Sequence, residues 1–246
     1  MTKALPTGRL YGIGLGPGDP ELLTVKAVRH LQAAPIVAYF AKAGRRGNAR
    51  GIADQWISAS SEELPLYYPV TTELPFAEPA YNAALSGFYE KSAEVIAAHL
   101  VAGRDVALLC EGDPFFYGSF MPLYIRLKER FAVTVGPGVT GMSGCWTTAG
   151  APITWGDDVL TVLPGTLSAA SLTKRLSESD AAVVMKLGNN FAKVRDAIRD
   201  AGLMERAIYV ERGTMSAEIV MPLKAHTGDK APYFAMVLVP GNGRRP

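Results

Sequence analysis

The chain has 246 residues, with 25 Lys and Arg against 23 Asp and Glu and a formal net charge of +2. Its length suits one large or two compact α/β domains, and 48% hydrophobic with 20% charged residues is typical of a folded globular protein. The small net charge argues against a nucleic-acid partner, and no apolar run approaches the length of a membrane span. Because the N-terminus also lacks the apolar core of a signal peptide, we expect a cytoplasmic protein without a membrane partner.

Short apolar runs rich in β-branched residues alternate with longer helical patterns along the chain. This alternation predicts an α/β protein with a largely parallel sheet. Strands are expected at Leu10–Leu15, Ile36–Phe40, Val106–Cys110, Val133–Val135, Val159–Leu163, Ala181–Met185, Ile208–Val210 and Phe234–Val239. Helices are expected at Pro79–Ala102, Leu123–Arg130, Val139–Ala149, Leu172–Glu178 and Ala192–Ala201. We place a domain boundary so that residues 1–128 form the first domain and residues 129–246 the second.

The first expected strand runs directly into a glycine-rich turn over residues 14–20. Asp19 and Pro20 suit the N-cap and first position of a helix, but glycines at 12, 14, 16 and 18 exceed what a cap requires. A backbone without Cβ atoms lets a ligand approach closely at a strand-to-helix turn. A dinucleotide fingerprint would need glycine where Pro17 or Asp19 stands, so the turn is interpreted as a site for a ligand without phosphates.

Two further loops follow buried strands. Residues 111–118 contain Gly112, Asp113, Pro114 and three aromatic residues, which indicates either a ligand loop or a plain helix cap. Residues 136–144 again place glycines and small residues after a strand. The long segment 41–78, rich in glycine, proline and aromatic residues, is either a ligand-binding loop or an irregular connection.

The two cysteines, Cys110 and Cys145, have no metal-ligand spacing and exclude a disulfide framework. Cys110 closes an apolar run, so we expect it to be a buried small hydrophobic residue. No metal site is expected.

The three loops, in this order, resemble the tetrapyrrole methylase family, which has a GxGPGDPxxLT opening, a GDPxxYG loop and a PGVT turn. The matching segments are Gly14–Thr24, Gly112–Gly118 and Pro137–Thr140. The family more often has glycine where Glu111 stands. Weaker similarity at residues 185–186 and 211–214 extends the resemblance across essentially the whole chain.

The resemblance implies two α/β domains with a cofactor cleft between them, unlike the common Rossmann-type methyltransferase, and it implies a homodimer. The cofactor would be S-adenosylmethionine, converted to S-adenosylhomocysteine. Carried over by position, the cofactor-binding residues are Pro17, Gly112, Asp113, Phe116, Thr140, Gly141, Met185 and Gly213.

Four further segments, residues 11–16, 44–56, 68–70 and 184–186, most resemble one branch of the family. The resemblance implies methylation of precorrin-2 at carbon 20 to give precorrin-3A. Such a substrate is rich in carboxylates, so Arg45, Arg46 and Arg50 are expected to bind it, unless they belong to a solvated turn. Alternatives are methylation of uroporphyrinogen III or cobalt-precorrin-2, RNA or diphthine methylation, or a non-catalytic protein that binds an adenosyl ligand.

No residue is an evident proton acceptor for this reaction. Asp113 is the best-placed carboxylate for acid or base catalysis, although its cap and cofactor roles compete with that function. His30 and His99 fall within helical patterns, and His226 falls in an expected loop. Water or the carboxylates of the substrate are alternative acceptors.

Overall fold

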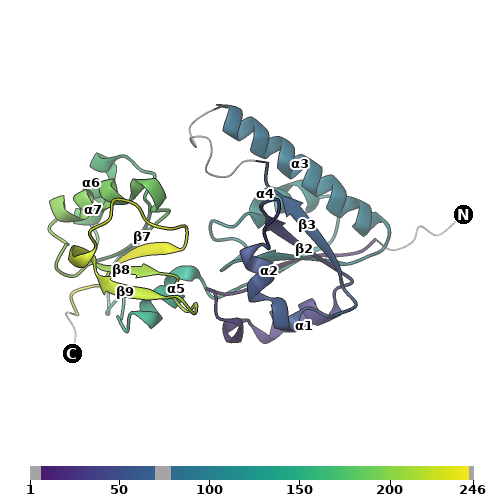
Figure 1. Ribbon diagram of the computed structural model, residues 1–246, viewed down its shortest axis with the longest axis horizontal. Helices are drawn as coiled ribbons and strands as arrows, with labels where there is room; N and C mark the ends of the chain where they lie inside the picture. The colour runs from purple at the N-terminus through teal and green to yellow at the C-terminus, as the bar shows by residue number, and fades with distance from the viewer. Residues whose placement is uncertain (1–6, 70–78, 244–246) are drawn as a thin grey trace, which may run out of the picture. The chain divides into compact units, whose positions relative to one another are not determined.

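The computed structural model describes residues 7–69 and 79–243 of the chain, which divide into two compact units (Figure 1). The first unit comprises Met1–Thr140 and the second Gly141–Pro246. The boundary predicted from the sequence lies after residue 128. The division falls later because the strand Val133–Gly136 hydrogen bonds with Leu10–Gly14 and so completes the sheet of the first unit.

The first unit is built on a five-stranded sheet in which every pairing is parallel, with strand order β3-β2-β4-β1-β5. Its strands are β1 (Leu10–Gly14), β2 (Ile36–Ala41), β3 (Glu62–Tyr67), β4 (Val106–Cys110) and β5 (Val133–Gly136). Its α-helices are α1 (Val25–Ala33), α2 (Asn48–Ile52), α3 (Pro79–Val101) and α4 (Phe120–Leu127), with short 3-10 turns η1 (Pro20–Leu22) and η2 (Asp54–Trp56). Parallel pairing places the carboxyl ends of all five strands at one edge.

Helices cover both faces of this sheet because β4 is apolar on both sides. Leu108 and Cys110 pack with α3 and α4, whereas Ala107 and Leu109 pack with α1 and α2. All five residues of β4 are buried. Cys110 is therefore a core residue, as the sequence predicted, and its desolvation raises the pKa of the thiol well above the ordinary value.

The second unit contains a mixed five-stranded sheet with strand order β6-β7-β10-β8-β9. Its strands are β6 (Leu160–Pro164), β7 (Ala181–Met185), β8 (Ile208–Glu211), β9 (Ile219–Pro222) and β10 (Ala235–Val239). Its α-helices are α5 (Gly141–Thr148), α6 (Ala169–Ser177) and α7 (Phe191–Asp200), with the 3-10 turns η3 (Gly188–Asn190) and η4 (Leu223–Ala225). Only β6 and β7 pair in parallel, so the expectation of a largely parallel sheet was wrong for this unit.

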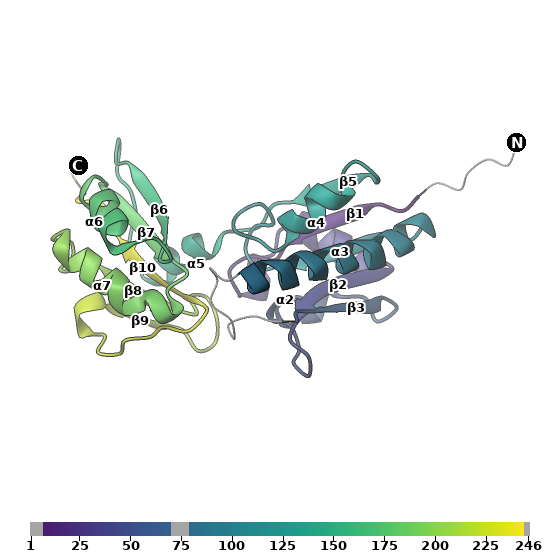
Figure 2. The same cartoon turned by 90° about the horizontal axis from the view of Figure 1, so that it is seen from above.

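The sheet of the second unit also has helices on both faces (Figure 2). Helices α6 and α7 pack together over one face through Leu172, Leu176, Phe191 and Val194. Helix α5 covers the other face, where Cys145 contacts the cluster of Val183, Val210 and Leu238.

Two local predictions in the first unit were incomplete. Asp19 does cap a helical turn, because its side chain accepts the N–H of Glu21 at 2.8 Å, but that turn is only η1. The following helix α1 has its own N-cap, Thr24, which accepts the N–H of Ala27 at 3.1 Å. Segment 41–78 contains α2 and the strand β3, and its residues 70–78 lie outside the described part of the chain. Strand β3 was not predicted because it contains Pro65. Proline is tolerated there because β3 is an edge strand.

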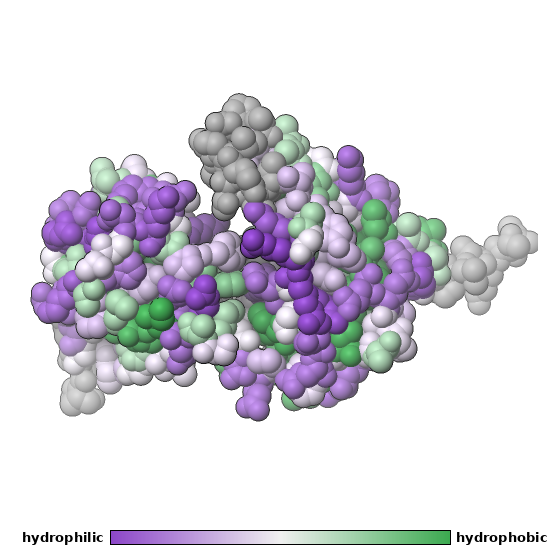
Figure 3. All heavy atoms as spheres, viewed as in Figure 1, coloured by the Kyte–Doolittle hydropathy of each residue, from purple (hydrophilic) through white to green (hydrophobic). Residues whose placement is uncertain are grey.

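The visible face of the protein is a mosaic of hydrophilic and hydrophobic residues (Figure 3). Large exposed apolar side chains lie apart in the fold: Val25 begins α1, Ile125 lies in α4, and Tyr233 precedes β10. Within residues 7–69 and 79–243, no helix is both long and apolar enough to cross a membrane.

Candidate functional site

The first set of expected site residues follows three strands that neighbour one another, β4, β1 and β5. The loop after β1 is joined to the loop after β4 by backbone hydrogen bonds: Gly112 donates to the carbonyl of Gly16 at 2.8 Å, and Gly16 donates to Gly112 at 3.3 Å. Leu15 also donates to the carbonyl of Cys110 at 2.9 Å. Residues nearly one hundred positions apart in the chain therefore form one backbone framework.

The glycines of these loops serve primarily to pack backbone against backbone. A Cβ atom on Gly138 would collide with the carbonyl oxygen of Gly112, and one on Gly14 would lie 2.5 Å from the nitrogen of Gly138. Gly16 and Gly112 have φ angles of 78° and 64°, which side chains disfavour. The interpretation that all these glycines leave room for a ligand was thus incomplete, because several make room for one another.

Asp113 connects the second loop to the third. Its Oδ1 accepts the backbone N–H of Phe115 at 2.9 Å, and its Oδ2 accepts the backbone N–H of Gly138 at 3.1 Å. No helix starts at Pro114, so the plain helix-cap interpretation of this loop is wrong. Both carboxylate oxygens hold loop backbone, which favours a positioning role over proton transfer.

The aromatic side chains of the second loop differ in their surroundings. Phe116 is half-buried and meets Tyr117 edge to face with ring centroids 5.0 Å apart. Phe115 is exposed and leans on Phe120 and Tyr124 of α4. Phe116, the expected cofactor contact, thus remains partly accessible, as do Pro17 in the first loop and Thr140 in the third.

Glu111 is a half-buried acid at the end of β4, directly before the second loop. Burial raises the pKa of its carboxyl, and hydrogen bonds from its own backbone N–H and that of Ala49 oppose the rise. Its departure from the glycine usual in the family was visible in the sequence, but its contact with α2 was not.

The three loops carry negative charge. Residues 15–19, 111–118 and 137–140 contain Asp19, Glu111 and Asp113 and neither lysine nor arginine. A phosphate ligand would meet repulsion in such a place, whereas a sulfonium cation would be attracted. The charge of the loops therefore fits an S-adenosyl sulfonium compound and disfavours a dinucleotide.

The three arginines expected to bind substrate have unequal surroundings. Arg50 is buried and bridges two carboxylates, donating to Asp54 at 2.9 Å and to Glu63 at 2.6 Å. Arg46 is exposed and pairs with Asp54 through two nitrogens, at 2.6 and 3.1 Å. These contacts lower the pKa of both carboxyls. Arg45 is exposed, and no ion pair is seen for its side chain within the described residues.

The second unit gathers its three expected cofactor residues around α5. Gly141 begins this helix, and a Cβ on it would lie 3.1 Å from Cε of Met236 in β10. A Cβ on Gly213 would lie 3.0 Å from the sulfur of Cys145 in α5. Continuing the pairing of β7 with β10 places Met185 opposite Met236, on the face of the sheet that α5 covers.

The histidines have structural surroundings. His99 is buried within α3, and the ring of His30 in α1 lies 4.4 Å from that of Tyr11. Burial is the largest cause that lowers the pKa of both imidazoles. The sequence placed both in helices, and this prediction is confirmed.

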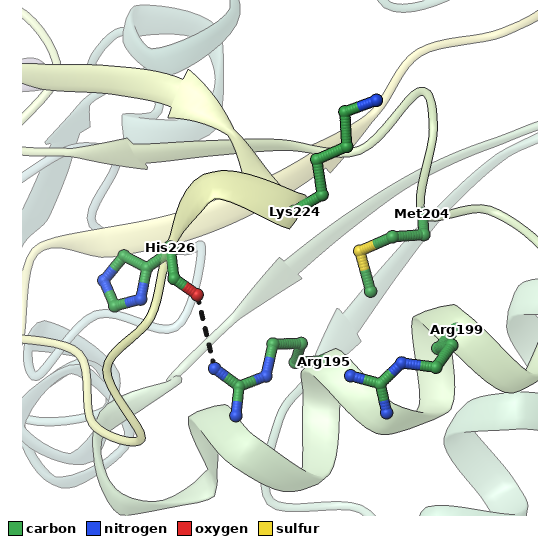
Figure 4. Close-up of a pocket in the computed structure, with 5 residues that line it drawn as sticks. All are labelled: Arg195, Arg199, Met204, Lys224 and His226. Atoms are coloured by element: carbon green, nitrogen blue, oxygen red, sulfur yellow. Dashed lines mark hydrogen bonds between the residues drawn. The ribbon is translucent and has the colours of Figure 1, made fainter.

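A separate pocket of about 300 Å³ lies in the second unit and is lined by Arg195, Arg199, Met204, Lys224 and His226 (Figure 4). Its cations are already neutralised: the three basic side chains pair with Asp229, Asp196 and Glu205, respectively, at 2.6 to 2.7 Å. None of the residues expected to bind cofactor or substrate lines this pocket. Within the described residues, no cluster of three His, Cys, Asp or Glu side chains could hold a metal ion.

Comparisons with known proteins agree over nearly the whole chain. The family model described as Tetrapyrrole (Corrin/Porphyrin) Methylases matches residues 9–227. A protein of Sinorhizobium sp named precorrin-2 C(20)-methyltransferase is 55% identical over 97% of this chain and 98% of its own length.

Two solved structures share the fold. A cobalt precorrin-4 methyltransferase, called a cobalamin biosynthetic enzyme, has a TM-score of 0.71 at 24% identity and covers 97% of this chain and 96% of its own. Uroporphyrin-III C-methyltransferase from Thermus thermophilus, complexed with S-adenosylhomocysteine, has a TM-score of 0.63 at 23% identity, with 94% and 97% covered.

Proposed function

The chain belongs to the tetrapyrrole (corrin/porphyrin) methylase family, and on that premise we propose that it transfers a methyl group from S-adenosylmethionine to carbon 20 of precorrin-2. The product is precorrin-3A, an intermediate of cobalamin biosynthesis. The observation that carries this proposal is 55% identity to a protein named precorrin-2 C(20)-methyltransferase, over nearly the full length of both.

S-adenosylmethionine, when bound, supplies an electrophilic methyl group on a positively charged sulfur. The acidic loops of the first unit complement that charge with Asp19 and Asp113, and their backbone is fixed by the bonds between Gly16 and Gly112. Carboxylates held in this way favour binding of the sulfonium cation. In the proposal, the binding residues are those expected by position: Pro17, Gly112, Asp113, Phe116, Thr140, Gly141, Met185 and Gly213.

Bound S-adenosylmethionine would give its methyl group to carbon 20 and leave as S-adenosylhomocysteine, while the proton that carbon 20 loses would pass to water or to a carboxylate of the substrate. Carbon 20 of precorrin-2 is enamine-like, so no strong protein base is needed to create the nucleophile. The contribution of the protein is to hold carbon, methyl and sulfur in line, which can remove roughly 7 to 11 kcal/mol of barrier. Asp113 serves this alignment by tying the second loop to Gly138 in the third.

In the proposal, arginine side chains in and before α2 bind the polycarboxylate substrate. Arg45 and Arg46 are the exposed members of the expected trio, whereas Arg50 is buried and shares Asp54 with Arg46. A homodimer in the cytoplasm, without nucleic-acid or membrane partners, completes the proposal. It is supported by the family resemblance and by the small net charge of +2.

Turnover with competing tetrapyrroles tests this function. Purified protein is incubated with S-adenosylmethionine and precorrin-2, cobalt-precorrin-2 or uroporphyrinogen III under anaerobic conditions, and S-adenosylhomocysteine is quantified. The largest kcat/KM is expected with precorrin-2. A larger value with either other tetrapyrrole would reassign the substrate, and binding of the cofactor without turnover of any of them would identify a non-catalytic adenosyl-binding protein.

A further inference from the structure

Four residues other than glycine adopt left-handed backbone conformations within residues 7–69 and 79–243. They are Tyr117, Lys186, Arg212 and Thr214, with φ angles of 54°, 57°, 50° and 71°. Side chains with a Cβ atom disfavour this region, and such strain tends to persist at ligand-binding sites. Tyr117 lies in the second loop of the first unit. The other three flank residues of the second unit that are expected to bind cofactor, namely Met185 and Gly213.

Lys186 and Arg212 emerge at the same edge of the second sheet. Strands β7 and β8 both run antiparallel to β10, which lies between them, so their carboxyl ends share an edge. Ala235 of β10 pairs with Glu211, and continuing the other register places Ala235 opposite Lys186. Neighbouring strands are about 4.8 Å apart, and β10 lies between β7 and β8. The backbones of Lys186 and Arg212 are therefore separated by roughly 10 Å across this edge.

The backbone that carries each cation is firmly held. Gly165 donates to the carbonyl of Met185 at 2.6 Å, and a Cβ on Gly165 would lie 3.0 Å from the carbonyl oxygen of Lys186. Arg212 donates its backbone N–H to the carbonyl of Phe234 at 2.7 Å. These contacts fix the two turns and therefore the points from which the cationic side chains extend.

The side chains of Lys186 and Arg212 both reach solvent, and Glu211 orients that of Arg212. Lys186 is exposed, and the side chain of Arg212 is 42% exposed. Nη1 of Arg212 donates to Oε1 of Glu211 at 2.8 Å, and the other oxygen of Glu211 accepts the hydroxyl of Tyr209 at 3.0 Å. Glu211 is thereby satisfied from two sides, while the guanidinium carries further N–H donors beyond that bond.

We propose that Lys186 and Arg212 bind carboxylate groups of the ligands of this enzyme, an inference that rests on the proposed function. Glycine would adopt either backbone conformation without steric cost, so a long cationic side chain at each position is present in spite of strain. An ammonium and a guanidinium both form charge-assisted hydrogen bonds with carboxylates. Both the tetrapyrrole side chains and the methionine portion of the cofactor offer one.

Glycine substitutions distinguish a role of the side chain in binding from a role in stability. Lys186→Gly and Arg212→Gly remove the cation and relieve the backbone at once, so we expect an unchanged or higher Tm together with weaker ligand binding. The loss of one charge-assisted contact should raise the Kd of the affected ligand about tenfold. Lys186→Arg, which keeps the charge, should remain close to wild type.

Two titrations by calorimetry identify the source of the carboxylate. A raised Kd for S-adenosylhomocysteine would assign the cations to the cofactor, and a raised Kd for precorrin-2 with S-adenosylhomocysteine unaffected would assign them to the substrate. The control is Lys174→Ala, which removes an exposed cation from α6 and should change neither constant.

The inference is overturned if both glycine variants keep both dissociation constants within about twofold of wild type. Loss of binding accompanied by a large fall in Tm would also contradict it, because the side chains would then be structural. Binding is measured separately from turnover, so wild-type protein that binds precorrin-2 without methylating it would refute the proposed function alone.

Discussion

The guanidinium of Arg50 is a buried charge whose free energy depends on two carboxylates. Its side chain is 9% exposed, and its terminal nitrogens contact Asp54 and Glu63. Burying a cation is favourable only when such partners are present. The sequence grouped Arg50 with Arg45 and Arg46, since composition alone does not reveal which member of an arginine cluster faces inward.

Arg50→Ala should lower the free energy of unfolding by about 2 kcal/mol, because Glu63 loses its arginine partner and Asp54 keeps only Arg46. Arg45→Ala removes an exposed side chain and should change stability by less than about 0.5 kcal/mol while raising the KM for precorrin-2. Urea denaturation and initial rates measure the two effects. Equal losses of stability in both variants would refute this division of roles.

Glu111 is the acid of the second loop whose protonation should affect stability. Its folded-state pKa is raised from the ordinary value of 4.5 by burial, so the folded protein binds this proton more tightly than the unfolded chain. The corresponding stabilisation is complete below the ordinary pKa and is lost as pH rises through the raised value.

Glu111→Gln keeps the side chain neutral at every pH. The variant should therefore gain stability relative to wild type as pH increases from about 4 to about 7. Thermal unfolding of both proteins across this range measures the difference. A difference in Tm that is independent of pH would show that the environment of Glu111 does not disfavour its charge.

Among the elements, the strand ends of the first unit were the most predictable. The run Val106–Cys110 has the bounds of β4, because it is apolar at every position and is stopped by a glycine-containing loop. Strand β3 was missed because Pro65 interrupts its pattern, and β9 was missed because it has only four residues and ends in a proline. The direction of strand pairing in the second sheet could not be predicted from the sequence either, since it depends on long-range topology.

The packing of the loops after β1, β4 and β5 against one another can be tested by adding one methyl group at Gly138. Gly138→Ala introduces a Cβ that would collide with the carbonyl oxygen of Gly112, so we expect a loss of more than about 2 kcal/mol of stability and weaker binding of S-adenosylhomocysteine.

Gly51→Ala is the matched control. A Cβ there meets no atom within 4 Å and lies inside α2, so this substitution should raise stability by up to about 1 kcal/mol. Urea denaturation and calorimetric titration are run on both variants. If Gly138→Ala were as stable as Gly51→Ala, the three loops would not pack as described.

At the scale of the whole molecule, the family and its two-unit α/β architecture were predictable from three short motifs, because glycine and proline positions define turns whose backbone few other residues can form. The roles of Asp113 and Arg50 were not predictable, since they depend on contacts between loops and helices. The cofactor and substrate contacts carried over by position remain proposals for both units.

The central claim is that this protein places a methyl group on carbon 20 of precorrin-2. A single turnover with S-adenosylmethionine labelled with ¹³C in its methyl group, followed by carbon NMR of the isolated pigment, tests it most directly. We predict one enriched resonance, from a methyl group bonded to carbon 20, in a pigment heavier by one methylene unit. Enrichment at any other carbon, or an unlabelled pigment after S-adenosylmethionine has bound, would contradict the account.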